Sequence, residues 1–339
     1  MLRESMLSRK LDNGQVKCHI CAHSCVVRPD SRGVCRVREN RDGCLYSLVY
    51  GKIITENVDP IEKKPLFHVL PGSKSYSIAT MGCNFHCSFC QNHQISQIPP
   101  QNDFWGEGDT TPEAVVASAM AAGCQSIAYT YTEPTVYFEF AFDCCRLAHE
   151  KGIKNVFISN GYMSPEAIDV ISPYLDAVNV DLKAFSRDFY RGQCGASLQP
   201  VLDALKGLKD KGIWVEVTTL LIPTLNDRPE ELKQLAAYIY SLGPETPWHI
   251  SRFHPQYKVQ TINPTPVPAI QDALQIGKDA GLYYVYSGNI PGEKTEKTFC
   301  RACNHLLIDR VGFSVESISL VNGACPNCQT SLDGLWATE

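Results

Sequence analysis

The sequence predicts an α/β fold, a partial (β/α)6 barrel between two small cysteine-rich modules. From residue 76 to residue 286, short apolar runs alternate with helix-like segments, which is typical of βα units in a parallel sheet. Cysteines gather near both ends of the chain, and its 339 residues suffice for one barrel-sized domain with small additions. We expect modules over residues 1–70 and 293–339 to flank a barrel over residues 71–292. An open doubly wound sheet is the alternative.

The central region contains seven apolar runs with the length of β-strands. They are residues 76–80, 126–130, 156–159, 177–182, 214–220, 249–253 and 283–286. Helices are expected in the six gaps, one of them beginning after Thr111, which is followed by a proline suited to the first helical turn. The other helices are expected over residues 136–151, 165–171, 199–211, 229–242 and 268–280. The alternation therefore supplies six βα units and a closing strand.

Composition narrows the functional classes. A net charge of -5 and a pI near 6.0 give no basic footprint for nucleic acid. The first ten residues lack the apolar core of a secretory signal, and Gly123 interrupts the longest uncharged stretch, which favours no membrane span. Without an export signal, sixteen cysteines indicate metal ligation in a reducing compartment. We therefore expect a cytoplasmic protein with no membrane association.

Three cysteines follow the first expected strand of the barrel. Cys83, Cys87 and Cys90 have C-x3-C-x2-C spacing, and no fourth cysteine follows at an ordinary interval. A closed zinc site requires four protein ligands, whereas a cubane iron-sulfur cluster accepts thiolates at each of its irons. Three thiolates on one loop therefore indicate a 4Fe-4S cluster with one iron open to a small molecule.

This loop, with Phe89 as the aromatic residue before the last cysteine, resembles the signature loop of the radical S-adenosylmethionine (SAM) enzymes. The resemblance implies that the open iron binds the amine and carboxylate of SAM. It also implies that one electron cleaves SAM to a 5'-deoxyadenosyl radical, which removes hydrogen from a substrate. An electron donor such as flavodoxin or ferredoxin is implied as a partner.

Four more cysteines lie in the N-terminal module. Cys18, Cys21, Cys25 and Cys35 have C-x2-C-x3-C-x9-C spacing, which supplies four ligands to one site. Zinc and an auxiliary iron-sulfur cluster use the same thiolates, and we place zinc slightly ahead. This leader resembles the amino end of proteins related to pyruvate formate-lyase activating enzymes, including the AmmeMemoRadiSam branch.

The C-terminal module contains Cys300, Cys303, Cys325 and Cys328, which form two C-x2-C pairs separated by 21 residues. This spacing is typical of a zinc ribbon or a rubredoxin-like iron site. We favour zinc, because so short a segment cannot bury enough apolar surface without a metal. Iron remains the alternative and would offer an electron path.

Candidate SAM contacts follow the expected strands, because ligands of parallel α/β folds bind at the carboxyl ends of their strands. The second strand leads to Glu133 and the third to Asn160, while alternation in the fourth places Asp181 and Lys183 on one face. Opposite charges at a strand end suit a zwitterionic ligand with a ribose. A charge at a helix N-terminus is the alternative for Glu133, and an internal ion pair is the alternative for Asp181 and Lys183.

Two of these segments extend the resemblance to activating enzymes. Their Gly-Gly-Glu-Pro segment meets the amino group of the bound methionyl moiety. Here Glu133 and Pro134 are kept, while Tyr131 and Thr132 replace the glycines. The Asp-Leu-Lys triplet that ends at Lys183 also resembles this group, which implies cofactor binding by that strand.

Two further residues are candidates for the catalytic step. Cys194 lies on an expected loop of the active face, where it can relay a radical or form a substrate adduct, and His254 follows the sixth strand as a candidate for proton transfer. A small apolar filler is the alternative for Cys194, and a structural role is the alternative for His254.

The resemblance extends over nearly the whole chain and is strongest to the radical SAM protein of the AmmeMemoRadiSam group. It implies reductive cleavage of SAM and, as further partners, Memo-like and Amme-domain proteins, but it does not supply a substrate. A glycyl-radical activating enzyme is the first alternative. A non-catalytic metal-binding interaction protein is the second.

Overall fold

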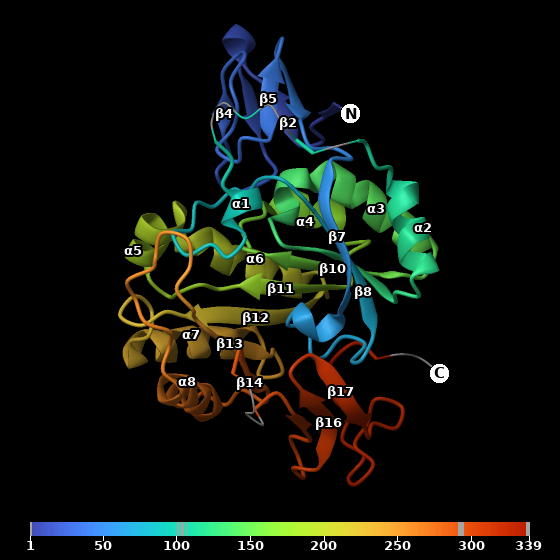
Figure 1. Cartoon of the computed structure of the whole chain (residues 1–339), viewed down its shortest axis with the longest axis vertical. Helices are drawn as coiled ribbons and strands as arrows, with labels where there is room; N and C mark the ends of the chain where they lie inside the picture. Colours follow the sequence, from blue (N-terminus) through green and yellow to red (C-terminus); the bar gives the residue numbers. More distant parts are fainter. Residues whose placement is uncertain (1, 100–101, 103–104, 107, 291–294, 337–339) are drawn as a thin grey trace.

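The computed structural model describes residues 2–99, 102, 105–106, 108–290 and 295–336. Its central feature is a sheet in which seven consecutive parallel strands lie side by side in chain order (Figure 1). They are β8 (Lys74–Thr80), β9 (Ser126–Tyr129), β10 (Lys154–Ser159), β11 (Ala177–Asp181), β12 (Trp214–Leu221), β13 (Trp248–Arg252) and β14 (Val285–Gly288). The strand order never reverses, as in a barrel. The doubly wound alternative, which requires a reversal, is therefore wrong.

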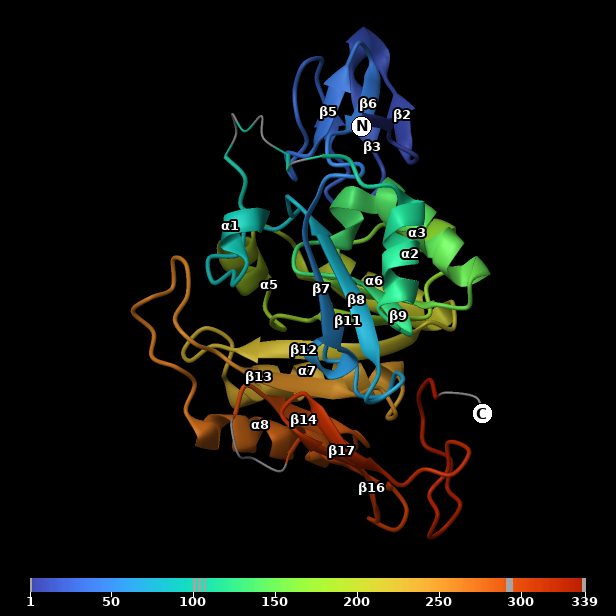
Figure 2. The ribbon, with the colours of Figure 1, turned by 45° about the vertical axis from the view of Figure 1, so that its right-hand side comes forward.

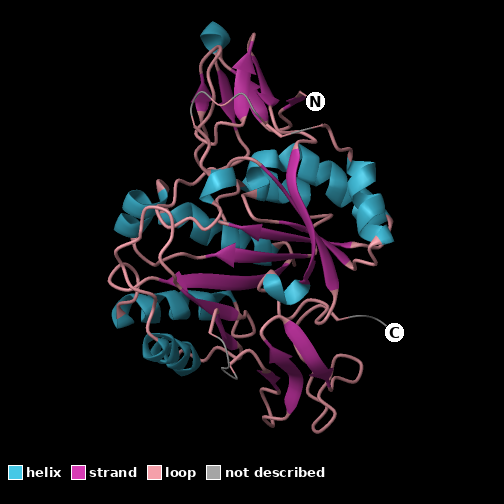
Figure 3. Cartoon of the chain, viewed as in Figure 1, coloured by secondary structure: helices cyan, strands magenta, loops and turns pink. Residues whose placement is uncertain are grey.

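Helices connect the parallel strands and lie outside the sheet (Figure 3). The long ones occupy the expected gaps: α2 (Pro112–Ala121), α3 (Phe138–Glu150), α4 (Pro165–Ile171), α6 (Leu198–Asp210), α7 (Pro229–Leu242) and α8 (Val267–Asp279). The short ones are η1 (Asp12–Gly14), η2 (Ile61–Lys63), α1 (His93–Ser96), η3 (Pro134–Tyr137), α5 (Arg187–Phe189) and η4 (Tyr190–Cys194). As expected, Thr111 caps α2, since its hydroxyl oxygen accepts a hydrogen bond from the backbone N–H of Ala114 at 3.2 Å. Among the described residues, no helix has both the length and the apolar composition of a membrane span.

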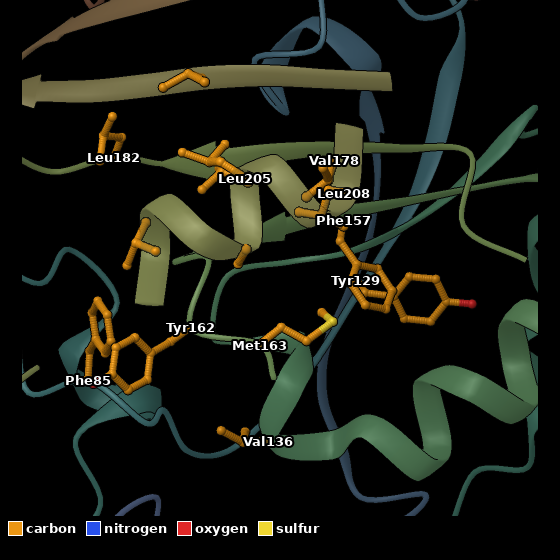
Figure 4. Close-up of a cluster of buried hydrophobic side chains, with 14 of the residues drawn as sticks. Phe85, Tyr129, Val136, Phe157, Tyr162, Met163, Val178, Leu182, Leu205 and Leu208 are labelled. Atoms are coloured by element: carbon orange, nitrogen blue, oxygen red, sulfur yellow. The ribbon is translucent and has the colours of Figure 1, made fainter. Parts of the chain in front are cut away.

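The core fills the space between the sheet and its helices. Leu205 and Leu208 of α6 point toward the strands that carry Phe157 and Val178 (Figure 4). All four residues of β9 are buried, which explains why this strand appears in the sequence as a continuous apolar run. The helical layer therefore fixes the positions at which the parallel strands end.

An additional strand, β7 (Ile53–Pro60), pairs antiparallel with β8 at the edge of the sheet. This strand was not predicted from the sequence. Exposed Glu56 and Asn57 interrupt the apolar alternation, and Pro60 is tolerated because the strand lies at an edge. The main sheet thus begins at Ile53, inside the range expected for the N-terminal module.

The N-terminal module contains two small antiparallel sheets above α3 and α4 in Figure 1. One sheet contains β1 (Arg3–Glu4), β6 (Cys44–Ser47) and β5 (Arg38–Arg41), and the other contains β2 (Ser8–Lys10), β3 (Val16–Cys18) and β4 (Val26–Val27). The module is joined to the barrel by the fully buried ion pair between Arg38 and Glu139, whose two N···O distances are both 2.8 Å.

The C-terminal module lies at the opposite end of the molecule (Figure 2). It is a three-stranded antiparallel sheet of β15 (Thr298–Phe299), β16 (Leu306–Val311) and β17 (Ser314–Ile318). Buried Arg310 joins it to the barrel by donating a hydrogen bond to the carbonyl oxygen of Phe67 at 2.6 Å. The boundary expected between the barrel and the C-terminal module, at residues 292 and 293, lies outside the described residues.

Candidate active site

The three-cysteine loop follows β8 and lies at the edge of the sheet where the parallel strands end. Among the described residues, only the C-terminal cysteines form a set of three or more ligands whose atoms all lie within 4.8 Å of one another. The sulfurs of Cys83, Cys87 and Cys90 are therefore spread more widely. A single tetrahedral zinc, with Zn–S bonds of about 2.3 Å, requires sulfurs about 3.8 Å apart. The wider spacing fits a multi-iron cluster, which separates its ligands by its own size.

The surroundings of the loop also fit a cluster. The Nδ2 atom of Asn84 is buried and has no hydrogen-bond partner among the described residues, so a donor is free beside Cys83. Asn160 aims its own Nδ2 at the Cys83 sulfur at 3.7 Å. Burial raises the pKa of Cys83 well above its ordinary value and also raises that of Cys90. These thiols become thiolates only with a compensating positive charge, which bound iron supplies.

Asp181 and Lys183 leave β11 beside this loop. Their side chains form an ion pair with an N···O distance of 2.9 Å, and the Lys183 ammonium lies 6.0 Å from the ring centroid of Phe89. Burial opposes the charge on Lys183, but Asp181 outweighs it, so the pKa of Lys183 is raised well above its ordinary value. A permanent cation thus lies next to the cysteine loop, and Asp181 remains partly exposed.

Glu133 is buried where β9 and β10 end. Its carboxylate accepts hydrogen bonds from the backbone N–H of Asn160 at 2.8 Å, the hydroxyl of Ser159 at 2.9 Å and the N–H of Thr135 at 3.0 Å. The last of these hydrogen bonds caps the N-terminus of η3. A charge at a helix N-terminus was the alternative role predicted for Glu133. Glu133 therefore holds two strand ends together, and a contact between Glu133 and SAM stays a prediction.

The resemblance to activating enzymes implies a glycine at the position of Tyr131, and the φ of Tyr131, 60°, lies in the left-handed region that favours glycine. The chain around it maintains this conformation. The Tyr131 carbonyl accepts a hydrogen bond from Asn92 Nδ2 at 2.7 Å, and its hydroxyl donates one to Asp59 at 2.5 Å. Lys64 lies over the ring at 4.6 Å from its centroid. The side chain has changed, but the backbone keeps a glycine-like turn.

The two catalytic candidates are placed differently. Cys194 is buried against the cysteine loop, where its carbonyl accepts a hydrogen bond from His86 N–H at 2.8 Å. A hydrogen bond from the Cys194 thiol lowers the pKa of Cys87, and the charge of Lys183 lowers it further, while burial opposes both effects. His254 instead is exposed on the loop after β13. Cys194 therefore belongs to the immediate surroundings of the loop.

Other residues of the loop after β13 contact the cysteine loop, and sequence reasoning missed them. Lys258 N–H donates a hydrogen bond to the Ser88 carbonyl at 2.9 Å, and the Tyr257 ring stacks on His93 with centroids 4.5 Å apart. Neither residue belongs to a periodic pattern. The only available signal was their position beyond the carboxyl end of a parallel strand.

The C-terminal cysteines form a compact site remote from this edge. The sulfurs of Cys300 and Cys328 are 3.5 Å apart, and those of Cys303 and Cys325 are 3.6 Å apart. These distances are close to the sulfur spacing of about 3.8 Å expected around one tetrahedral ion. The geometry therefore fits a single ion of zinc or iron.

Comparison with known proteins agrees with this geometry. The family model of the radical SAM superfamily matches residues 77–236, which span β8 to α7 and include the three-cysteine loop. This part of the chain is a radical SAM domain. A domain of this family implies an enzyme that uses a 4Fe-4S cluster and SAM.

Relatives of this radical SAM chain include a protein of Methanocaldococcus jannaschii described as uncharacterized, which is 44% identical over 98% of this chain and 99% of its own length. The pyruvate formate-lyase-activating enzyme of Streptococcus mutans is 26% identical over 54% of this chain and 72% of its own length. The structure of a radical SAM methyltransferase from Sphaerobacter thermophilus aligns with a TM-score of 0.52 and 18% identity, over 70% of this chain and 71% of that one. The last similarity shows a shared fold alone.

Proposed function

We propose that this enzyme reductively cleaves SAM at a 4Fe-4S cluster bound by Cys83, Cys87 and Cys90, and that the product removes hydrogen from an organic substrate. The wide spacing of three thiols on one loop at the strand ends carries the proposal. When bound, the cluster and SAM supply a 5'-deoxyadenosyl radical, so the protein's own tasks are binding, orientation and exclusion of water.

Named side chains are suited to these tasks. Lys183 offsets the negative charge of the thiolates, since it lies beside Phe89 and lowers the pKa of Cys87. Asn160 supplies a donor to the Cys83 sulfur. Asp181 is partly exposed at the strand end and can accept hydrogen bonds from the ribose or the amino group of SAM. Phe89 is buried and excludes water from the loop.

Anaerobic reconstitution tests the proposal. With dithionite and SAM, the wild type should form 5'-deoxyadenosine, measured by liquid chromatography and mass spectrometry. The Cys87→Ala variant should form none, because one iron loses its ligand. Cys124→Ala, which changes a buried cysteine outside the three groups, should keep wild-type activity. A folded wild type that contains the cluster and forms no 5'-deoxyadenosine would overturn the proposal.

Similarity to a pyruvate formate-lyase-activating enzyme supports a second candidate, the transfer of the radical to a glycine of a partner protein. A glycyl-radical EPR signal in a co-purified partner would support it, and substrate turnover without any partner would exclude it. We also propose membership of the AmmeMemoRadiSam group, with Memo-like and Amme-domain partners, on the basis of the motifs shared along the chain. Co-purification with tagged versions of such proteins tests that assignment.

A further inference from the structure

The N-terminal module encloses a cavity against the barrel. The cavity is lined by Cys18, Cys21, Cys25 and Cys35. Val136, between β9 and α3, closes the barrel side of the cavity and is buried. Four cysteines from separate turns of one small module thus face the same space.

The spacing of these thiols distinguishes between the two metals that share such a ligand set. Among the described residues, no three of the four sulfurs lie within 4.8 Å of one another, whereas the C-terminal four all do. A single zinc requires sulfurs about 3.8 Å apart. The N-terminal thiols, like those of the radical SAM loop, are therefore spaced too widely for a single zinc ion.

We propose that Cys18, Cys21, Cys25 and Cys35 bind a second 4Fe-4S cluster, in which the protein ligates all four irons. This assignment replaces the preference for zinc drawn from ligand spacing in the sequence. It does not rest on the proposed chemistry of the central loop, because the two ligand sets share no residue.

The surroundings suit an anionic group. Arg38 lines the cavity and is 3% exposed, so its charge is not screened by water. Glu139 fixes the guanidinium with two hydrogen bonds of 2.8 Å, and the carbonyl of Val136 accepts a third at 3.2 Å. A positive group is thus held rigidly beside the thiolates, while apolar Ile20 and Val27 line other walls.

The cavity lies directly behind the radical SAM loop. His23, which lines the cavity, has its Nε2 atom 2.7 Å from the carbonyl oxygen of Asn84, the residue after Cys83. The Tyr162 ring packs against His23, with ring centroids 4.8 Å apart. It also packs against Phe85, with centroids 5.0 Å apart (Figure 4). A continuous set of contacts therefore connects the two cysteine sets.

A cluster without an open iron binds no substrate, so its role is electron storage or transfer. A low-potential one-electron donor such as a ferredoxin would reduce it, and it would return that electron to the loop cluster. One cluster is then oxidised as the other is reduced, and no bond or proton is exchanged.

A variant lacking the central ligands tests the assignment while leaving the N-terminal site intact. Cys83→Ala/Cys87→Ala/Cys90→Ala should reconstitute with about four iron and about four sulfide per chain and, after reduction, give a 4Fe-4S EPR signal that SAM does not change. Two zinc ions and no sulfide in this folded variant would overturn the inference. A folded variant that holds no metal at the N-terminal site would do the same.

A second pair of variants keeps the central loop. Cys21→Ser/Cys25→Ser leaves only two thiolates and should lose about four of about eight iron atoms, whereas Cys44→Ser, a change in the same module outside the cavity, should lose none. Equal iron content in the two variants would contradict the inference. If the wild type makes no 5'-deoxyadenosine but the loop variant retains its cluster, the proposed function fails and this inference stands.

Discussion

The two terminal modules each offer four cysteines, yet they hold them in different ways. The C-terminal sulfurs pair at 3.5 and 3.6 Å, as around one ion, while the N-terminal sulfurs stand apart around a cavity. Ligand type and number are the same at the two sites. Backbone turns therefore set the distance between the thiols at each site, and geometry of this kind is one of the means by which proteins select metals.

The modules also dock at opposite ends of the barrel, each through a buried arginine. Arg38 joins the N-terminal module to Glu139 near the ends of the strands, where the cysteine loop lies. Arg310 joins the C-terminal module to Phe67 and, at 3.6 Å, to Glu62, near the starts of the strands. Among the described residues, the N-terminal module contacts the cysteine loop through His23 and Asn84. We expect the C-terminal module to act on stability.

The largest effect should come from removing the C-terminal metal. Cys325→Ala should lose the ion and unfold residues 295–336, because structural zinc contributes about 10–16 kcal/mol to the folding of small zinc modules. Limited proteolysis and zinc analysis measure this, with Cys124→Ala as the control. If the C-terminal module is as protease-resistant without metal as with it, its packing, and not the ion, holds it together.

A smaller loss is expected from breaking the N-terminal docking pair. Arg38→Met leaves the buried Glu139 carboxylate without its charged partner and with the hydrogen bond from Met6 N–H. The variant should lower the free energy of unfolding by about 3–5 kcal/mol. Denaturant titration measures the change. The double variant Arg38→Met/Glu139→Leu should regain part of the loss, because it removes the unpaired charge. A double variant no more stable than the single one would show that the pair does not dock the module.

The smallest effect concerns pH and the C-terminal module. Burial lowers the pKa of His68 to about 4, and the ring bonds the Asp333 carbonyl and the Tyr286 hydroxyl, both at 2.7 Å. The unfolded residue titrates near about 6.5. Between these pH values the unfolded chain binds more protons. The free energy of unfolding should thus fall by at most about 1.4 kcal/mol per pH unit as pH drops through this range.

Denaturation followed by tryptophan fluorescence tests this, since Trp214 and Trp336 both pack near His68, with ring centroids 5.9 Å from the His68 ring. The His68→Phe variant removes the titrating group and should show a flatter pH dependence between pH 4 and about 6.5. An unchanged slope in this variant would assign the acid sensitivity to another group.

The sequence predicted the barrel well because its strands are buried on both faces and its helices carry caps such as Thr111. It missed β7, whose polar Glu56 and Asn57 hide an edge strand. It found the residues at the strand ends but not the contacts of Lys258, because a loop's path depends on tertiary packing. It did not decide between zinc and an iron-sulfur cluster at the N-terminal site, because C-x2-C spacing does not determine the distance between sulfurs on two different turns.

Arg310 has a consequence for the order of assembly. Its partner Phe67 is synthesised 243 residues earlier, so a ribosome completes almost the entire barrel before the guanidinium emerges. Until then, water must solvate the Phe67 carbonyl and the Glu62 carboxylate. Insertion of the arginine therefore joins a segment that precedes the parallel strands to one that follows them. This contact forms only after all seven parallel strands have been synthesised.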